Sequence, residues 1–336
     1  MKALVTGGAG FLGSHLVERL VRDGEAVRVL ARETSRLDYL DKQRVEIVKG
    51  DLKDEAGIKK ALRGIDTVFH VAAATNGSWK EHLESTIHGT ELILSLAYAE
   101  GIKRLVHISS LSIYAVEHLP HGATVRETEP YEPDLEARGY YTRAKVESEK
   151  CVFKWYQEKK LPVCILRPGI IFGPRGNVFL PNIGFAIKNK LFVIIGRGRN
   201  LLPLTYVENV VDAILAAAKE DKAIGQAYNI VDESTITQEA YLKEYLRVTE
   251  TNGLRVKVPY LIPYVAAWGL EYAYRFLAPH SLPPISRYRL ACACKSIYYD
   301  NSKAKIDLGW RPKIKPEEAI QKTFEWYLSS RRKAGE

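Results

Sequence analysis

The N-terminus of the chain carries the sequence feature that most restricts its fold. A short apolar run at residues 3–5 is followed by Gly7, Gly10 and Gly13, and then by apolar residues at helical spacing. This order predicts a strand, a tight turn and a helix. Glycines let such a turn form, let the backbone approach a pyrophosphate and let the helix pack closely on the strand. A helix N-terminus presents free N–H groups and a positive dipole end, so the turn predicts a phosphate-binding site.

The spacing of these glycines, G-x-x-G-x-x-G, differs from the G-x-G-x-x-G of ordinary dinucleotide-binding turns. A plain glycine-rich turn is the alternative, but the position directly after an N-terminal strand favours phosphate binding. Strands and helices continue to alternate, which predicts an α/β fold: a Rossmann-type doubly wound parallel sheet. The expected strands span residues 26–31, 45–48, 67–71, 104–108 and 162–166, and the longest expected helices span 79–100 and 140–159.

The regular alternation stops near residue 175, and prolines interrupt most of the remaining chain. We therefore predict a dinucleotide-binding domain at residues 1–175, to which a segment at about 200–232 returns. Residues 176–336 are expected to form a smaller, mixed, mainly substrate-binding domain. Residues 115–138, with three prolines and many charges, are predicted to be a surface loop.

The composition is that of a globular protein, with 46% hydrophobic and 26% charged residues and a net charge of +9. The basic residues are scattered, so we expect a solvated surface that favours an anionic cofactor and no nucleic-acid partner. The four cysteines lack metal-binding spacing and predict reduced thiols and no metal site. The N-terminus fits no signal peptide, and we expect a cytoplasmic location.

Charged residues follow the second and third predicted strands, where open α/β sheets bind their ligands. Arg32 ends the second strand, with Arg28 and Arg36 nearby. An acidic residue there would bind a ribose 2′-hydroxyl, whereas an arginine accommodates a 2′-phosphate. We therefore expect NADP(H) rather than NAD(H), the alternative being that Arg32 is a solvated loop charge.

Two further strand ends suit a cofactor. Asp51 is placed either to meet an adenine amino group or to cap a helix that begins near Lys53, since aspartate is a favoured N-cap. Small side chains at Ala72 and Ala73 would let a cofactor lie against the backbone, although close packing alone also explains them.

Ser110, Tyr141 and Lys145 form the predicted catalytic set. Ser110 follows the fifth predicted strand, and Tyr141 and Lys145, four residues apart, share one face of a helix. A nearby ammonium favours the phenolate and lowers the tyrosine pKa from its usual value of about 10. Tyr141 would then exchange a proton with a substrate hydroxyl or carbonyl, Ser110 would hold that oxygen, and a nicotinamide would give or take the hydride.

Several segments along nearly the whole chain resemble one family. They read TGGAGFLG (6–13), GDL (50–52), HVAA (70–73), HISSLSIY (107–114), YTRAK (141–145), LRPGIIFGP (166–174), TYVENVVDAI (205–214), GQAYNI (225–230) and DNSKAKIDLGWRP (300–312). As a set they resemble the extended short-chain dehydrogenase/reductase family, also called the NAD-dependent epimerase/dehydratase family.

The resemblance implies that Ser110, Tyr141 and Lys145 are catalytic. Together with the glycine turn, it predicts a cofactor site at Gly7, Gly10, Phe11, Leu12, Gly13, Arg32, Asp51, Leu52, Ala72, Ala73, Lys145 and Pro168. Thr86 departs from the family, which usually has Asn there; the difference affects a backbone-bracing contact rather than the chemistry. The resemblance also implies a homodimer formed through the helices at 79–100 and 140–159.

The second half of the chain bears on the substrate. Relatives that act on nucleotide sugars share an Arg-Asp-Phe/Tyr run and a second, polar run. In this chain the positions that match the first run, 202–204, read Leu-Pro-Leu, and those that match the second, 290–295, read Leu-Ala-Cys-Ala-Cys-Lys. A diphosphate needs cations, ideally arginine forks. Residues 194–214 and 286–304 instead resemble the 3β-hydroxysteroid dehydrogenase branch.

We therefore expect an NAD(P)-dependent oxidoreductase that interconverts a secondary alcohol and a ketone on a lipophilic substrate, either sterol-like or like a long-chain keto acid. One alternative is a nucleotide-sugar 4-epimerase or reductase that uses the same site. Another is a non-catalytic cofactor-binding protein, since one fold serves many functions.

Residues 258–278 are rich in tyrosine, tryptophan and aliphatic side chains. Two prolines, Glu271 and Arg275 leave too short an apolar run for a transmembrane helix. The segment predicts a helix packed on its own domain, an apolar lid over a lipophilic substrate, or a peripheral contact with a membrane surface.

Overall fold

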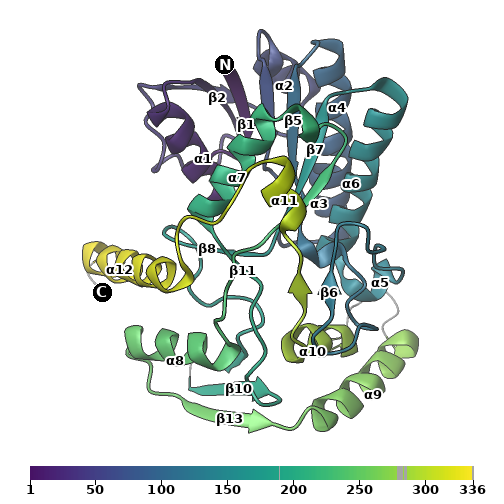
Figure 1. The fold of residues 1–336 in the computed structure, drawn as a ribbon, viewed down its shortest axis with the longest axis vertical. Helices are drawn as coiled ribbons and strands as arrows, with labels where there is room; N and C mark the ends of the chain where they lie inside the picture. The colour runs from purple at the N-terminus through teal and green to yellow at the C-terminus, as the bar shows by residue number, and fades with distance from the viewer. Residues whose placement is uncertain (189, 278–282, 284–285, 335–336) are drawn as a thin grey trace.

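A seven-stranded parallel sheet forms the centre of the computed structural model, which describes residues 1–188, 190–277, 283 and 286–334 (Figure 1). The strands are β1 (Lys2–Thr6), β2 (Ala26–Ala31), β3 (Val45–Lys49), β4 (Thr67–His70), β5 (Arg104–Ile108), β7 (Val163–Pro168) and β12 (Ala227–Ile230). Their spatial order is β3-β2-β1-β4-β5-β7-β12. The order reverses between β1 and β4, and the carboxyl ends beside this point are where such sheets bind ligands. The predicted doubly wound fold is confirmed.

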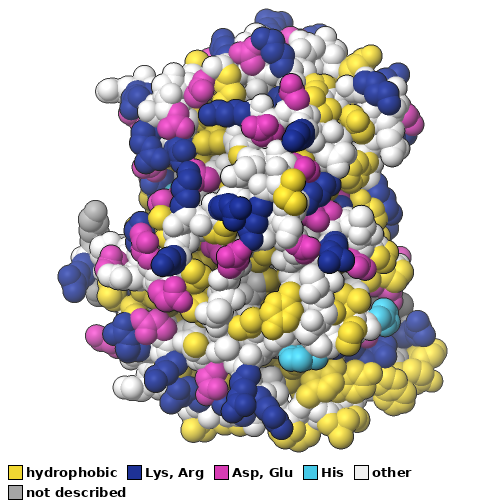
Figure 2. All heavy atoms as spheres, in the orientation of Figure 1, with side chains coloured by type: hydrophobic (Ala, Val, Ile, Leu, Met, Phe, Trp, Pro, Cys, Tyr) yellow, Lys and Arg dark blue, Asp and Glu magenta, His cyan; other side chains and the backbone are white. Residues whose placement is uncertain are grey.

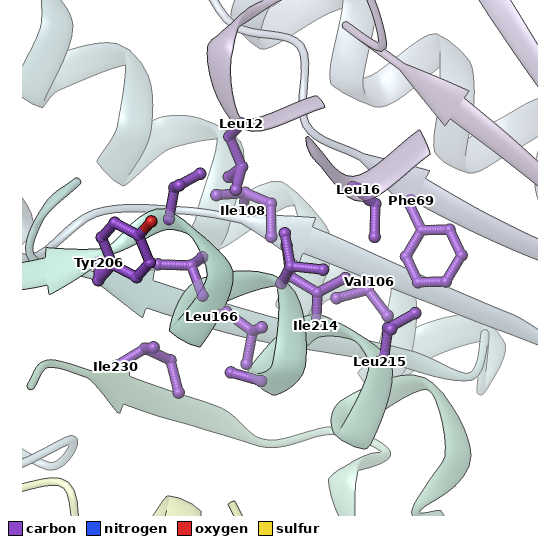
Figure 3. Close-up of a cluster of buried hydrophobic side chains, with 14 of the residues drawn as sticks. Leu12, Leu16, Phe69, Val106, Ile108, Leu166, Tyr206, Ile214, Leu215 and Ile230 are labelled. Carbon is purple, nitrogen blue, oxygen red and sulfur yellow. The ribbon is translucent and has the colours of Figure 1, made fainter. Parts of the chain in front are cut away.

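Helices cover both faces of the sheet. One face packs against α1 (Phe11–Arg22) and α7 (Val207–Lys219); the other packs against α2 (Glu55–Leu62), α4 (Gly89–Ala99) and α6 (Tyr140–Lys159). Figure 3 shows Leu16 of α1 and Ile214 of α7 beside Val106 of β5. The neighbouring Leu105 belongs to the cluster on the opposite face. Strands buried on both sides read as near-continuous apolar runs, because successive side chains alternate between two cores.

The helix expected at residues 79–100 is not uniform. It consists of α3 (Trp79–His82), a π-helical segment η1 (Leu83–His88) and α4. Thr86 lies in the wider turn, where its hydroxyl accepts a hydrogen bond from the Ala74 amide (2.9 Å). Thr86 therefore braces the backbone after β4 with its own side chain. The homodimer through this segment and α6 stays a prediction.

The segment expected to be a surface loop, residues 115–138, is partly ordered into β6 (Thr124–Val125) and α5 (Leu135–Arg138). Its end is fixed by an ion pair between Arg138 and Glu132 (3.1 Å), with both side chains almost fully buried. The description as a surface loop is therefore incomplete, because charges that look solvated in the sequence pair with each other inside the protein.

The second half of the chain begins a smaller unit with β9 (Phe185–Ile187) and β10 (Leu191–Ile195), returns to the large sheet at β12, and then completes the smaller unit. On this return β11 (Leu204–Tyr206) pairs with β8 (Ile170–Phe172), and α7 then leads to the edge strand β12. A separate sheet combines β9, β10 and β13 (Leu254–Val258). The remaining elements are η2 (Leu111–Ile113), η3 (Asp221–Ala223), α8 (Gln238–Val248), α9 (Leu261–Leu277), α10 (Arg287–Cys294), β14 (Tyr298–Tyr299), α11 (Ser302–Asp307) and α12 (Pro316–Ala334).

Figure 1 places the three-stranded sheet, α8 and α9 at the end of the molecule away from the N-terminus. In the part of the chain that the structure describes, no helix is both long and apolar enough to cross a bilayer. The domain boundary near residue 175 stays a prediction.

Candidate active site

A cavity of 1230 Å³ lies at the carboxyl ends of the central strands. The structure brings every residue predicted for the site into its wall. These residues are Gly7, Gly10, Phe11, Leu12, Gly13, Arg32, Asp51, Leu52, Ala72, Ala73, Ser110, Tyr141, Lys145 and Pro168. They come from the turn between β1 and α1, from the ends of five further strands and from the start of α6, so their convergence is a result of the fold. Their chemical roles stay predictions.

The glycine turn between β1 and α1 is tightly closed. Gly7 has a φ of +72°, and its carbonyl accepts a hydrogen bond from the Gly10 amide (2.9 Å). A Cβ on Gly13 would lie 2.1 Å from the Gly7 oxygen, and one on Gly7 would lie 2.9 Å from the Ala72 backbone. The first helical turn, beginning at Phe11, has no side-chain cap. The bare backbone and its free N–H groups suit a dinucleotide pyrophosphate.

We predict that Gly13→Ala destabilises the protein and weakens NADPH binding. The added methyl group forces β1 and α1 apart at a closed contact, which costs about 1–3 kcal/mol or more. Thermal unfolding and fluorescence titration with NADPH measure the two effects. Gly269→Ala is the matched control, because a Cβ there meets nothing within 4 Å. Unchanged NADPH affinity in Gly13→Ala would show that the turn does not hold the cofactor.

The residues after β2 form a cationic and hydroxylic corner of the cavity. Arg32 and Arg36 line it, and so do Thr34 and Ser35, which the sequence analysis did not single out. Their position directly after the strand was the available signal. Arg28 is not part of this corner: it is buried and donates to the carbonyls at the C-terminal end of α2. The prediction that Arg28 lies near the cofactor corner is wrong, because its side chain points to a face of the sheet and not along the strand.

Asp51 does not cap a helix that begins near Lys53. Helix α2 begins at Glu55, and Asp54 precedes it. The Asp51 carboxylate accepts a hydrogen bond from the Lys53 amide (3.2 Å), which closes a turn before the helix. Of the two roles considered for Asp51, contact with the cofactor is the one compatible with its place in the cavity wall.

The three predicted catalytic residues are in contact or near contact. The Ser110 oxygen accepts a hydrogen bond from the Ser112 amide (3.1 Å), and the Ser110 hydroxyl lies close enough to the Tyr141 side chain to lower its pKa. Lys145 is buried and donates from Nζ to the Ile108 carbonyl (2.7 Å), at the end of β5. Its Nζ lies 5.9 Å from the centre of the Tyr141 ring. Strand β5 and helix α6 thus hold the set together.

The prediction that the pKa of Tyr141 is lowered is wrong for this structure, in which that pKa is raised. Burial raises the pKa of Tyr141, and its hydrogen bond with Ser110 acts in the opposite direction. Burial also lowers the pKa of Lys145 to about 8, against the raising effect of Glu149. Desolvation therefore dominates the pKa of both groups, and the Lys145 ammonium is directed to a carbonyl. Tyr141 is a neutral phenol near pH 7, the form that donates a proton.

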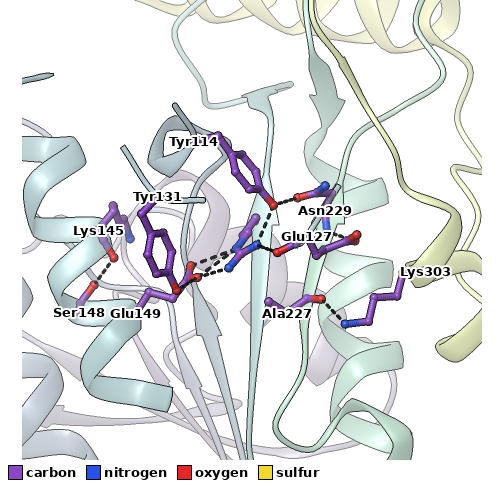
Figure 4. Close-up of polar contacts among 10 residues, drawn as sticks. Tyr114, Glu127, Tyr131, Lys145, Ser148, Glu149, Ala227, Asn229 and Lys303 are labelled. Atoms are coloured by element: carbon purple, nitrogen blue, oxygen red, sulfur yellow. Dashed lines mark hydrogen bonds and ion pairs between the residues drawn. The ribbon is translucent and has the colours of Figure 1, made fainter. Parts of the chain in front are cut away.

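A buried polar network lies one helical turn behind Lys145 (Figure 4). Arg167 of β7 forms a short ion pair with Glu149, and also donates to the Tyr114 hydroxyl (2.7 Å). Tyr131 donates to Glu149 (2.9 Å), and Tyr114 donates to Asn229 (2.6 Å). The network joins α6, β7 and β12 and fixes the helix that carries Tyr141 and Lys145. This role was not predicted from the sequence, although an arginine at a buried strand position is a signal for a buried partner.

A second buried arginine braces the turn after β5. Arg138 donates to the carbonyls of Ser112 (2.8 Å) and Tyr114 (2.7 Å). Its guanidinium carbon lies 3.0 Å from the centre of the Tyr288 ring, and Tyr288 lines the cavity. Arg138 thus links the segment after Ser110 to the C-terminal part of the wall, a role the sequence analysis did not assign.

The end of the cavity formed by later residues is largely apolar. Its wall there includes Leu202, Pro203, Tyr288, Ile297 and Tyr299. Lys295 is also in the wall, and its ammonium donates to the backbone carbonyls of Glu117 and Leu119. The side chains of Arg289 and Cys292 lie outside the described residues. Cys151 and Cys164 are free thiols, and the Cys294 thiol donates to the Ile195 carbonyl (3.5 Å).

Comparison with known proteins agrees with this geometry. A model of the NAD dependent epimerase/dehydratase family matches residues 3–231. The chain is 31% identical to sterol-4-alpha-carboxylate 3-dehydrogenase, decarboxylating, of Mus musculus, over 96% of this chain and 90% of that protein. It is 30% identical to 3beta-hydroxysteroid-dehydrogenase/decarboxylase isoform 2 of Arabidopsis thaliana, over 96% of this chain but only 61% of the plant protein. It is 28% identical to 2-alkyl-3-oxoalkanoate reductase of Stenotrophomonas maltophilia, over 96% and 98% of the two chains.

Solved structures share the fold. The crystal structure of gox2253 superposes with a TM-score of 0.80 at 25% identity, over 98% of both chains. UDP-glucose 4-epimerase of Thermotoga maritima, solved with UDP-glucose, superposes with a TM-score of 0.76 at 23% identity, over 98% of this chain and 99% of that one. The second likeness establishes the architecture and nothing about the substrate.

Proposed function

Because the chain belongs to the NAD-dependent epimerase/dehydratase family and is an NAD(P)-dependent oxidoreductase of the extended short-chain type, we propose that it interconverts a secondary alcohol and a ketone on a lipophilic substrate. The substrate would be sterol-like or like a long-chain keto acid. The apolar wall beyond Tyr141 carries this proposal. Leu202 and Pro203 line it, at positions where the family resemblance places the cationic run of nucleotide-sugar enzymes. The names of the sterol dehydrogenases and of the oxoalkanoate reductase support the same substrate class.

The chain's own residues would manage the proton. A bound nicotinamide dinucleotide would supply or accept the hydride. Tyr141, neutral at pH 7, would donate its phenolic proton to the oxygen of a ketone and would take one back in the oxidative direction. Ser110, which lies beside Tyr141, would hold the same oxygen. Lys145, whose ammonium is held by the Ile108 carbonyl at the end of β5, lines the same cavity as this pair.

Nicotinamide absorbance with a panel of 3-ketosteroids, β-keto acids and UDP-sugars tests the proposal. We expect net cofactor oxidation with at least one ketone of the lipophilic classes and none with UDP-sugars. Interconversion of UDP-sugar epimers without net change of cofactor would instead favour the epimerase alternative. No turnover of any class, together with cofactor binding, would favour a non-catalytic role.

We also propose that the cofactor is NADP(H), which the corner formed by Arg32, Thr34, Ser35 and Arg36 supports. We predict that Arg32→Asp lowers NADPH affinity relative to NADH by about tenfold to a hundredfold, since a hydrogen bond between charged groups contributes about 1.5–3 kcal/mol. Parallel titrations with both cofactors give the ratio. Arg63→Asp, the same charge change at an exposed residue outside the cavity, is the control. Equal NADPH and NADH affinities in the wild type would contradict the preference.

A further inference from the structure

Helix α9 presents a stripe of large apolar side chains to solvent. Leu261, Val265, Trp268, Tyr272 and Phe276 recur at intervals of three or four residues and so share one side of the helix. Each is well exposed, from 58% for Trp268 to 69% for Leu261. The Trp268 and Phe276 rings both contact Tyr272, with ring centres 6.4 Å and 5.0 Å apart. Contiguous exposed apolar surface of this kind marks an interaction site.

The opposite side of α9 is already occupied, so the stripe is not a misplaced core face. Ala267 is fully buried in a cluster with Ile195 of β10 and Leu290 of α10. The Glu271 carboxylate accepts hydrogen bonds from the Arg287 backbone amide (2.7 Å) and from its Nε (2.6 Å). These contacts fix the rotation of α9 and direct the stripe, called here the α9 face, outward.

The surroundings of the α9 face are basic. Arg275 is exposed beside the stripe, and Arg255 is exposed on β13, directly before α9, where Lys257 is also exposed but pairs with Glu239 (2.8 Å). The segment at 182–200, which includes β10, holds four Lys or Arg residues and no Asp or Glu. Between residues 251 and 277 the single acid is Glu271, which is paired with Arg287. In Figure 2 apolar atoms cover the lower right of the molecule, where Figure 1 places α9, and basic side chains lie along the adjoining lower edge.

The apolar α9 face and its basic surroundings together fit one kind of binding partner. Two copies of the α9 face meeting each other would bring the same cationic residues together, which opposes association. An anionic bilayer offers an apolar layer for Trp268 and its neighbours and a negative surface for the arginines and lysines. We propose that α9 lies in the interface of an anionic lipid bilayer, with the α9 face buried among the headgroups and upper acyl chains. The described helices do not cross a bilayer, so the contact is peripheral.

The same attachment would place the site beside the lipid. Helix α10, which packs against α9, carries Tyr288 in the wall of the cavity. A substrate dissolved in the bilayer would therefore meet the apolar end of the cavity close to the membrane. This consequence rests on the proposed function, whereas the attachment itself rests only on the surface.

Co-sedimentation with vesicles tests the attachment. We expect the wild type to bind phosphatidylcholine vesicles that contain phosphatidylglycerol, and to bind pure phosphatidylcholine vesicles more weakly. Trp268→Asp/Tyr272→Asp should lower the partition coefficient by at least about tenfold. Arg255→Glu/Arg275→Glu should remove the preference for anionic vesicles. Ile306→Asp is the matched control, because Ile306 is 75% exposed but lies on α11, and it should bind as the wild type does.

A second readout guards against unfolding of the aspartate variant. The tryptophan emission of the wild type should shift to shorter wavelength with anionic vesicles, and Trp268→Phe, which keeps the face apolar, should lose most of that shift while it still binds. Absence of wild-type binding, or equal binding by Trp268→Asp/Tyr272→Asp, would overturn the proposal. A wild-type dimer that the aspartate variant dissociates, without vesicle binding, would show that a second copy covers the face. Because no substrate is present, each of these results leaves the proposed oxidoreductase activity untouched.

Discussion

Replacing Tyr141 with phenylalanine is expected to lower kcat by about 10²- to 10⁴-fold, the usual contribution of a positioned general acid or base. The ring keeps its volume, so the cavity and the cofactor site should persist. What is lost is the one phenolic proton beside Ser110. Stopped-flow or steady-state rates with the best ketone of the panel give kcat, and fluorescence titration gives the dissociation constant for NADPH, which should not change.

Tyr140→Phe is the matched control for this prediction. Tyr140 precedes Tyr141 in α6, but its ring packs against Trp79 and His82 and is not in the cavity wall. Its variant should retain nearly the full rate. If Tyr141→Phe turns over substrate as fast as Tyr140→Phe does, Tyr141 is not the proton donor and another group must be sought.

The buried ion pair behind the site gives the second large effect. Arg167→Met should lower the free energy of unfolding by about 3–5 kcal/mol, because it leaves Glu149 charged and unpaired in the interior. Glu149 is fully buried, and Arg167 is only 4% exposed. The midpoint of urea unfolding, followed by circular dichroism, measures the loss. Because Glu149 lies one turn after Lys145, loosening of α6 should lower kcat as well.

Two comparisons decide whether burial of the charge is the cause. Arg247→Met breaks an exposed pair with Glu244 and should cost about 1 kcal/mol or less. The double variant Glu149→Gln/Arg167→Met removes both charges and should be more stable than Arg167→Met alone. A loss in Arg167→Met no larger than in Arg247→Met would mean that the network contributes little to stability.

The sheet and the glycine turn were predictable because their signals are local. The apolar run before Gly7 and the helical spacing after Gly13 depend on a few neighbouring residues. The convergence of Ser110, Tyr141 and Lys145 could be expected because parallel strands place their carboxyl ends on one edge of a sheet. The site residues could therefore be named, although neither their distances nor their protonation could.

The predictions from sequence were wrong or incomplete for Arg28, for the pKa of Tyr141 and for Arg167, because the direction or burial of a side chain decides the chemistry there. Arg28 and Arg32 stand close in sequence, but the strand register turns Arg28 to the C-terminal end of α2. The pKa of Tyr141 depends on desolvation, which spacing on a helix does not report. The network around Arg167 joins residues up to 115 positions apart.

The exposure of the apolar segment around Trp268 could not be predicted from the sequence either. Its composition suited a buried helix as well as an exposed one, and only the contacts of Ala267 and Glu271 reveal which side faces outward. Packing against later elements, rather than the sequence of the helix, sets that orientation.

Transfer of a labelled hydride tests the central claim most directly. The wild type is incubated with NADPH deuterated at its transferable position and with a lipophilic ketone, and the product is analysed by mass spectrometry. We expect a secondary alcohol with one deuterium on the carbinol carbon, formed about 10²- to 10⁴-fold more slowly by Tyr141→Phe. Unlabelled ketone recovered intact, together with interconversion of UDP-sugar epimers by the same protein in a parallel reaction with NADP⁺ and without net formation of NADPH, would contradict that claim.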